Sequence, residues 1–303
     1  MADAVIRTRE IIKVYNGRAV VNGVSMTLAR GEIYGFVGNN GAGKTTLIRM
    51  LTGLAQPTSG TMELFGGGDA RSIAAARKKM GSVIDSPAVY KNMSAEENLK
   101  MRAYTLGIKP DFAEVLGTVG LGGVGNKLAS NFSMGMKQRL GIAMALLGNP
   151  ELLILDEPIN GLDPEGIVEF REFLKYINRT RGITILISSH VLGELHKVAT
   201  AYGIIRDGIL VAEFPKSALD AFIRPYIRIA VDNPVAARNA LTDGGINRTD
   251  ILHNNVIRVF ERIDDIPFLV QTLKAAGVLT LSIESVTDDS EAFLVSLMGG
   301  IRY

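Results

Sequence analysis

The fold of this chain is decided by the segment Gly38-Asn39-Asn40-Gly41-Ala42-Gly43-Lys44-Thr45, which fits the phosphate-binding pattern GxxxxGK(S/T). A strand-like run over residues 33–37 precedes it, and a helix-like run over 45–51 follows it. Glycines let backbone N–H groups curl toward phosphate oxygens, and the start of a helix adds the positive end of its dipole. We therefore expect Lys44 to reach the β- and γ-phosphates and the Thr45 hydroxyl to ligate Mg²⁺. Nucleoside triphosphate binding accounts for this arrangement better than a chance glycine-rich turn.

Length, charge and cysteine content narrow the class of protein. At 303 residues the chain can hold one large domain or two modest ones. A formal net charge of +2 gives no argument for nucleic acid as a partner, so we expect none. Without cysteine, disulfides and thiolate metal sites are excluded, which is compatible with the reducing cytoplasm. The first residues lack the apolar core of a secretory signal, and no run of about 20 apolar residues predicts a membrane span.

Strands and helices are predicted to alternate along the first two thirds of the chain. Asn16-Gly17 indicates a hairpin turn between extended segments 5–14 and 20–28. The short apolar runs at 152–155 and 183–188 are separated by a helical pattern at 164–179. This alternation favours an α/β fold with a parallel sheet covered by helices.

Residues 94–150 are predicted to be mostly helical. Ser94 and Glu97 form the sequence pattern of a capping box, and Leu99, Met101 and Leu106 are expected to begin an apolar helix face.

The pattern changes at Phe214-Pro215, after a hairpin over 204–211 whose turn is Asp207-Gly208. We therefore predict one domain over residues 1–214 and a small α+β accessory domain over 215–303. The order βαββαβ in the second domain suggests a small sandwich with a final helix near 290–298. The predicted segments are strand 226–231, helix 234–241, strands 249–252 and 256–260, helix 266–275 and strand 279–285.

An apolar strand at 152–155 ends in two acids, Asp156 and Glu157. Parallel strands deliver functional groups at their carboxyl ends, where ligands bind. Asp156 is expected to hold Mg²⁺, and Glu157 to orient or deprotonate an attacking water. The alternative is an ordinary solvated acidic turn. The phosphate loop upstream favours the catalytic interpretation over this alternative.

Further motifs follow in order: Ser133-Met134-Gly135-Met136 at a helix start, Gly161-Leu162-Asp163-Pro164, and His190 after Ser188-Ser189. With the phosphate loop, they resemble the ATP-binding subunit of an ABC transporter over about residues 5–215. The resemblance implies a P-loop NTPase (RecA-like) core over 1–214, with an antiparallel β subdomain and a helical subdomain at about 94–150. It also implies ATP hydrolysis with Mg²⁺ in a head-to-tail pair of subunits, taken here as a homodimer, with two nucleotides between them.

Individual roles carry over by matching position. The resemblance implies that Glu157 and His190 are catalytic, and that Tyr15 stacks on adenine, although a plain strand tyrosine is the alternative. It further implies that the partner subunit supplies Ser133, Gly135, Met136 and Asp163 to the opposite nucleotide. The complete nucleotide-binding set on this reasoning is Tyr15, Gly38, Asn39, Asn40, Gly41, Ala42, Gly43, Lys44, Thr45 and Thr46.

Two motifs depart from the common pattern of the family. Met134 and Met136 stand where glycine and glutamine are usual, and Asp85 stands where most members carry glutamine. A subset that handles bacitracin-like and lantibiotic peptides carries glutamate there and a similar signature, and the chain is most like that subset. Asp85 is therefore expected to approach Mg²⁺, with Thr45 and Asp156 as the other protein ligands; a plain loop acid is the alternative.

The resemblance implies an ATPase subunit of an exporter for antimicrobial peptides or drugs. It would be cytoplasmic, lie on the inner face of the membrane and drive a separate integral membrane permease. The permease would dock on the helical insert and the loop after Asp85, with Tyr90, Met93 and Phe112 as candidate contacts. The alternative is a soluble ABC-type switch acting on a ribosome or DNA, which the single cassette and the lack of heptads disfavour. A regulatory module without turnover is disfavoured because Glu157 and His190 are both present.

Overall fold

The computed structural model describes residues 3–222 and 225–286. The chain forms two compact units, Met1–Lys216 and Ser217–Tyr303. In the ranges described, every helix is too short or too polar to cross a membrane.

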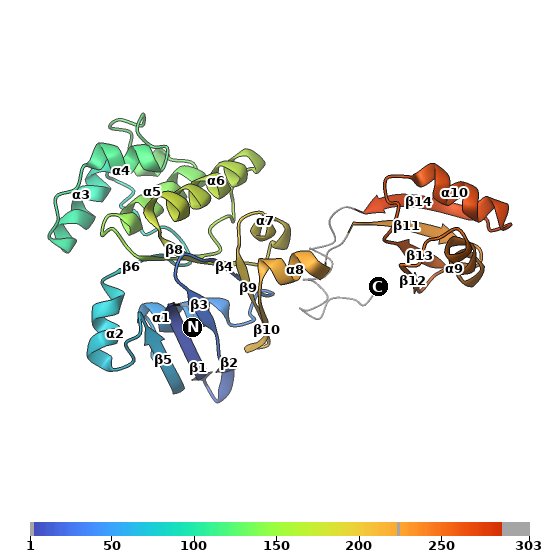
Figure 1. Cartoon of the computed structure of the whole chain (residues 1–303). Helices are drawn as coiled ribbons and strands as arrows, with labels where there is room; N and C mark the ends of the chain where they lie inside the picture. Colours follow the sequence, from blue (N-terminus) through green and yellow to red (C-terminus); the bar gives the residue numbers. More distant parts are fainter. Residues whose placement is uncertain (1–2, 223–224, 287–303) are drawn as a thin grey trace. The chain divides into compact units, whose positions relative to one another are not determined.

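The centre of the first unit is a six-stranded sheet with the order β10-β9-β4-β8-β7-β6 (Figure 1). Five neighbouring strands are parallel, and β10 pairs antiparallel with β9 at the edge. The central strands β4, β7 and β8 are wholly buried, as expected for continuous apolar runs in a sheet covered on both faces. Their carboxyl ends therefore meet at one edge. The strands span β4 Ile33–Val37, β6 Met80–Val83, β7 Leu152–Asp156, β8 Thr184–Ser189, β9 Ala201–Arg206 and β10 Ile209–Pro215.

An antiparallel sheet lies against this centre. Its central strand is β1 (Ala4–Tyr15). The other three strands, β2 (Arg18–Val24), β3 (Thr27–Ala29) and β5 (Ser59–Leu64), each pair with β1. The predicted Asn16-Gly17 turn is confirmed. The extended segment expected over 20–28 is divided between β2 and β3, because the buried Thr8 hydroxyl donates to Val24 O and accepts from Met26 N and so interrupts the ladder.

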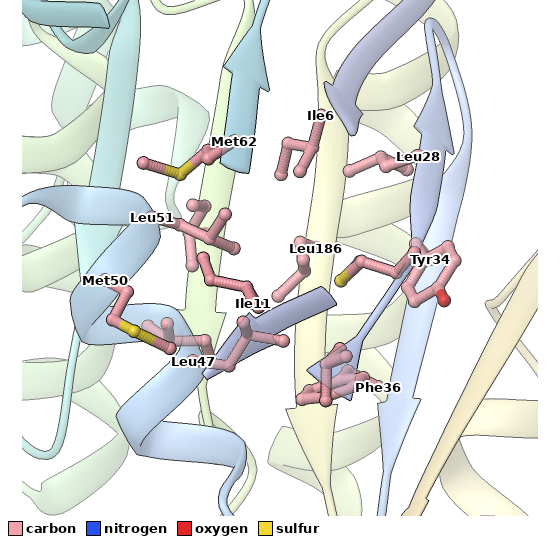
Figure 2. Packing of buried hydrophobic residues seen from close by; sticks show 14 of the residues in the cluster. Ile6, Ile11, Leu28, Tyr34, Phe36, Leu47, Met50, Leu51, Met62 and Leu186 are labelled. Carbon is pink, nitrogen blue, oxygen red and sulfur yellow. The ribbon is translucent and has the colours of Figure 1, made fainter. Parts of the chain in front are cut away.

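The main core joins the two sheets through helix α1 (Lys44–Thr52), which starts at the phosphate loop. Figure 2 shows Leu47 and Leu51 of α1 beside Ile11 of β1 and Leu186 of β8, all fully buried. Burying each of these side chains contributes about 1.5–3 kcal/mol. Because α1 packs against both sheets, the phosphate loop that leads into it is also fixed in position.

Helices α5 and α6 lie on the other face of the central sheet (Figure 1). The capping box is confirmed: Glu97 N donates to the Ser94 hydroxyl, and Ser94 N to the Glu97 carboxylate, at the start of α3. The predicted apolar face of α3 is only partly correct, because Leu99 is buried whereas Met101 and Leu106 are exposed. The remaining helices of this unit are α2 Ala70–Arg77, α3 Ala95–Leu106, α4 Phe112–Thr118, η1 Ala129–Asn131, α5 Met134–Leu146, α6 Pro164–Arg181 and α7 Leu192–His196.

Strand β10 continues through Pro215, past the sequence break at Phe214-Pro215. Pro215 is the last residue of an edge strand, where the missing N–H group costs no ladder bond. Helix α8 (Lys216–Phe222) follows.

The second unit has the sheet order β12-β13-β11-β14, entirely antiparallel. Its elements follow one another as β, α, β, β, α, β, which is the order expected from the sequence. Residues from α9 and α10 pack on the sheet in a separate core. The predicted helix near 290–298 lies outside the described residues. The elements are β11 Tyr226–Val231, α9 Pro234–Asp243, β12 Thr249–Leu252, β13 Val256–Val259, α10 Ile266–Ala275 and β14 Thr280–Val286.

Candidate functional site

The phosphate-loop sequence connects β4 to α1 and depends on glycine at two positions. Gly43 has φ 107°, and a Cβ atom there would lie 2.7 Å from Val20 O. A Cβ atom on Gly38 would lie 2.4 Å from Ile205 O. Both positions therefore exclude any side chain, and the loop follows the surrounding backbone closely. It borders a cavity of about 170 Å³ lined by Val20, Asn40, Gly41, Gly43, Lys44, Thr45, Thr46 and Glu157.

Lys44 is a buried cation at the first position of α1, with only 5% of its surface exposed. Its Nζ donates to Gly38 O at 2.6 Å and to Asn39 O at 3.2 Å. The same nitrogen lies 3.1 Å from Glu157 Oε1. The lysine thus braces the loop through its carbonyls while its charge faces the acidic end of β7.

Thr45 and Asp156 meet across the sheet edge, although 111 residues separate them. The Thr45 hydroxyl donates to Asp156 Oδ2 at 2.7 Å, and the Ser188 hydroxyl donates to Asp156 Oδ1 at 2.5 Å. Glu157 N donates to the Ser188 hydroxyl oxygen at 2.9 Å. Ser188 therefore fixes both acids. In the sequence Ser188 stands out only as a flank of His190, and its place near the end of the adjacent apolar strand β8 is the signal that could identify it.

Glu157 is held in a strained backbone conformation with φ 48°, unusual for a residue other than glycine. Its Oε2 lies 2.8 Å from His190 Nδ1. Its Oε1 is buried, and the ion pair with Lys44 does not have hydrogen-bond geometry, so this oxygen has no hydrogen-bond partner among the described residues. The carboxylate is therefore aimed by the backbone, oriented by His190 and left with one buried lone-pair site available.

These residues fit a nucleotide with Mg²⁺. A buried lysine and the start of α1, where the first N–H groups have no partner within the helix, suit phosphate oxygens. The Thr45 hydroxyl and the Asp156 carboxylate supply adjacent oxygen donors, the ligand type that Mg²⁺ prefers alongside phosphate and water. The orphaned Glu157 Oε1 is placed to accept a hydrogen bond from a water at the same edge.

The signature residues lie in a second cavity of about 410 Å³, which Ser133, Gly135, Met136 and Asp163 help to line. Ser133 caps α5 by accepting from Met136 N, and Asp163 caps α6 by accepting from Gly166 N. The two motifs also touch. A Cβ on Gly135 would lie 3.2 Å from Leu162 Cδ2, and one on Gly161 would lie 3.2 Å from Met134 Cγ. Among the described residues, no hydrogen bond or ion pair joins them to Lys44 or Thr45 of the same chain.

Tyr15 and Asp85 complete the expected set. Tyr15 ends β1 and is 44% exposed, with Lys13 Nζ 4.9 Å from its ring centroid. Asp85 is exposed and pairs with Arg49 of α1, whose Nη2 lies 2.6 Å from Asp85 Oδ2. Arg49 could not be identified from the sequence, because no sequence pattern joins two residues 36 positions apart.

Residues 21–160 match the family model described as ABC transporter. The chain is 40% identical over 299 residues to the bacitracin transport ATP-binding protein BcrA of Bacillus licheniformis, covering 98% of each chain. It is 42% identical over 209 residues to the lantibiotic transport ATP-binding protein SrtF of Streptococcus pyogenes, covering 69% of this chain and 90% of that one. Among solved structures it is similar to cbiO1 from Clostridium perfringens, part of the ABC transporter complex cbiONQ. That similarity has a TM-score of 0.64 and 26% identity over 72% of this chain and 91% of the other.

The BcrA similarity spans both compact units, whereas the SrtF and cbiO1 similarities cover about as much of the chain as the first unit alone. The family match and the similarity to a solved ATP-binding subunit confirm the P-loop NTPase fold expected from the sequence. With the phosphate loop, the acidic strand end and His190 gathered at one sheet edge, the chain belongs to the ATP-binding subunits of ABC transporters, which hydrolyse ATP.

Proposed function

We propose that this chain drives a separate membrane permease that exports antimicrobial peptides, and that it does so as a homodimer around two Mg-ATP molecules. The observation that carries the catalytic part is the geometry around Glu157, which joins Lys44, Ser188 and His190 at the ends of three parallel strands. The relatives named for bacitracin and lantibiotic transport support the substrate class. A switch acting on a ribosome or DNA has no comparable support.

The catalytic cycle follows from the ion pair between Lys44 and Glu157. A γ-phosphate competes with the Glu157 carboxylate for the same Nζ, so phosphate binding releases Oε1 to accept a proton from water. His190 holds Oε2 and therefore keeps the carboxylate pointed at the attacking position. Thr45 and Asp156 would hold a bound Mg²⁺, which would neutralise charge on the phosphates.

The positions of the signature residues support the proposed homodimer. Ser133 and Gly135 stand at the start of α5, a helix of 13 residues, in a cavity separate from that of Lys44. A helix start favours anions, and a second subunit placed head to tail would bring this one to the γ-phosphate. On this proposal Asp163, which caps α6 beside the signature, lies at the subunit boundary and links the two sites.

The experiment measures the molar mass of the Glu157→Gln variant by light scattering, with and without ATP. Slow hydrolysis should trap the dimer, so the mass should double with ATP, and Ser133→Arg in the same background should keep it monomeric. A Glu157→Gln protein that binds ATP yet stays monomeric would overturn the dimer. Export is tested separately. Cells that carry the chain with its permease should survive a peptide antibiotic, and cells that carry Glu157→Gln should not.

A further inference from the structure

The sheet of the second unit has two different faces. One face packs on α9 and α10 through a core that includes Ile229 and Ile257. Because successive residues of a strand point to opposite sides, the residues between these core positions share the other face. The strand pairings place on it Tyr226, Arg228, Ala230, Asp250, Leu252, Val256, Arg258, Phe260, Ser282, Glu284 and Val286. This set is called the open face below, and none of it belongs to the described core with α9 and α10.

A row of four charges crosses the open face. Arg228 of β11 and Arg258 of β13 are direct cross-strand partners, an arrangement of like charges that is unfavourable by itself. Acids on the two outer strands flank them at the same level, Glu284 on β14 and Asp250 on β12. These ion pairs are loose, with N–O distances of 4.0 Å from Arg228 to Glu284 and 3.4 Å from Arg258 to Asp250. The centre of the face is therefore positive and its two edges are negative.

Arg258 also has an unused hydrogen-bond donor. Its guanidinium carbon lies 5.3 Å from the ring centroid of Tyr226 and 5.8 Å from that of Phe260. Its Nε is buried and has no hydrogen-bond partner among the described residues. A buried donor without an acceptor costs free energy, which a carboxylate brought to the guanidinium would recover.

Apolar residues lie on both sides of this row of charges. Tyr226 and Phe260 form a ring pair on one side, and Ala230, Val256 and Leu252 lie side by side on the other. The open face is thus suited to a segment that has carboxylates next to apolar side chains.

The sequence that follows β14 has this composition, and it lies outside the described residues. Three acids come first, Asp288, Asp289 and Glu291, and an apolar stretch follows over 292–298. At helical spacing one side of this stretch is wholly apolar and contains Phe293, Leu294, Leu297 and Met298. Gly299-Gly300 is a sequence typical of the end of a helix.

We propose that residues 288–298 of this chain cover the open face, with a helix over 290–298 packed on its apolar residues and the acids bound to Arg228 and Arg258. Strand β14 ends at Val286, which pairs with Tyr226 on this face, so the segment starts beside it. Three extended residues reach about 10 Å, enough to bring an acid from there to the row of charges. A nine-residue helix is about 14 Å long, and four strands about 4.8 Å apart span about 14 Å.

The tether favours this occupant over a separate molecule. A segment joined to the face by two or three residues has an effective concentration on the order of millimolar or more, whereas a second copy or a foreign peptide has to be bound from solution. The second unit would then be a sheet covered on both faces, with its arginines paired inside the cover.

The test places the photoreactive residue p-benzoyl-phenylalanine at position 293 of the full chain and maps its crosslinks by mass spectrometry. Illumination should join position 293 to open-face residues such as Val256 or Phe260 within one molecule. The same residue at position 292, on the other side of the helix, is the matched control and should give at least about twofold less of this product. Crosslinks confined to α9, α10 or the first unit, or equal yields from both positions, would overturn the proposal. So would a crosslinked dimer whose yield rises with protein concentration, because it would identify a second copy as the occupant.

Charge is tested from both sides of the contact. Arg228→Gln combined with Arg258→Gln should lower the yield from position 293 at least about twofold. Arg238→Gln removes the same charge from the exposed side of α9 and should leave the yield unchanged.

Neutralising the segment instead, with Asp288→Asn, Asp289→Asn and Glu291→Gln together, should lower the yield by a similar factor without touching the described sheet. This second variant keeps the test valid if the arginine variant does not fold. Wild-type yields after neutralising the acids would refute the pairing with Arg228 and Arg258.

Discussion

Arg49 Nη2 lies 2.6 Å from Asp85 Oδ2, so the helix that starts at the phosphate loop is tied to the loop 84–90. The side-chain hydrogen bond with Asp85 raises the pKa of Arg49. Asp85 has φ 61°, and Ser86 N donates to Ile84 O at 2.8 Å, which closes a γ-turn of the rare, strained hand around it. Arg49 thus holds Asp85 in a strained turn, and it competes with any metal for the same carboxylate.

Removing Arg49 should make Asp85 available to the metal. We expect Arg49→Gln to lower the concentration of Mn²⁺ needed for half-saturation of the ATP-bound protein by about threefold, as measured by electron paramagnetic resonance. Arg49→Gln combined with Asp85→Ala should lose this gain. Lys175→Gln, which breaks an exposed ion pair on α6, is the control and should bind Mn²⁺ as the wild type does. Identical Mn²⁺ affinities in all four proteins would leave Asp85 an ordinary loop acid.

Substitutions of Asp85 itself should separate its charge from its reach. Asp85→Glu keeps the charge and should be tolerated best. If Asp85 approaches the metal as proposed, Asp85→Gln removes a negative charge there and should weaken the dependence on Mg²⁺. Asp85→Ala should reduce stimulation by the permease more than ATP binding, because Lys44 and the loop amides do not depend on it. Basal ATPase, Mg²⁺ dependence and permease-stimulated ATPase are the measurements. Three variants that match the wild type in each would exclude a role for Asp85 in coupling.

Glu157→Gln should leave ATP affinity near that of the wild type and lower turnover at least about 100-fold, because the proton acceptor is lost while the phosphate-binding groups remain. Lys44→Ala should instead weaken ATP binding itself. Single-turnover hydrolysis and fluorescent ATP titration distinguish the two effects. Glu172→Gln on α6 controls for the loss of a carboxylate elsewhere, and turnover above a tenth of wild type in Glu157→Gln would refute Glu157 as the base.

Strand β10 carries an exposed glutamate that binds the buried Tyr34, and this contact bears on where the chain can be shortened. Glu213 Oε1 accepts from the Tyr34 hydroxyl at 2.6 Å and from Thr27 N at 2.9 Å, and Tyr34 is fully buried. Burial, and then the charge of Glu213, raise the pKa of Tyr34 well above its usual value, so the hydroxyl stays a donor. We expect Glu213→Ala to destabilise the protein by about 1–3 kcal/mol. Combined with Tyr34→Phe it should cost less than the sum of the two single changes.

The contact between Glu213 and Tyr34 also predicts how two shortened chains should differ in thermal stability. A chain that ends at Phe222 keeps all of β10 and should bind Mg-ATP with a melting temperature close to that of the first unit in the whole protein. A chain that ends at Val211 loses Glu213 and should melt several degrees lower. Equal melting temperatures would show that the Glu213 contact contributes little. Failure of the longer chain to fold would make residues 223–303 part of the folding unit.

Stability in acid should depend on Glu194, which joins α7 to α6. Its carboxylate accepts from Arg171 Nη1 at 2.7 Å and from Lys197 Nζ at 2.8 Å. Burial acts to raise the pKa of Glu194, but these hydrogen bonds outweigh it and hold the pKa below its usual value of 4.5. The unfolded chain therefore takes up the proton first as pH falls, so the stabilisation is present above about pH 4.5 and is lost below it.

Between about pH 5 and pH 3 the melting temperature of the wild type should therefore fall more steeply than that of Glu194→Gln. Glu165→Gln, an exposed change near the start of α6, should follow the wild-type curve. Parallel curves for Glu194→Gln and the wild type would show that the Arg171 contact does not control acid stability.

Features defined by local sequence could be predicted. The phosphate loop, the apolar strands β4 and β7, and the Ser94 capping box each follow from a few adjacent residues. Contacts between distant residues could not, because side-chain pairing depends on how strands are ordered in the sheet. Arg49 with Asp85 and Tyr34 with Glu213 are of this kind.

The apolar spacing along α3 also gave a partly wrong prediction of which side chains are buried. Met101 has the spacing of a core residue on α3, yet its side chain is exposed. An apolar stripe does not say whether it meets the protein's own core or a partner. The same pattern therefore serves both purposes, and the structure is needed to separate them.

The positive φ of Glu157 has a consequence for engineering. A glutamate in this region costs of order 1–3 kcal/mol that glycine would not, and asparagine would bear the conformation more easily. Laboratory evolution that selects for heat resistance alone should therefore recover Glu157→Gly or Glu157→Asn. Each such variant should be more stable to heat and should no longer hydrolyse ATP. The heat tolerance of this protein is limited, at that one residue, by the direction in which a carboxylate has to point.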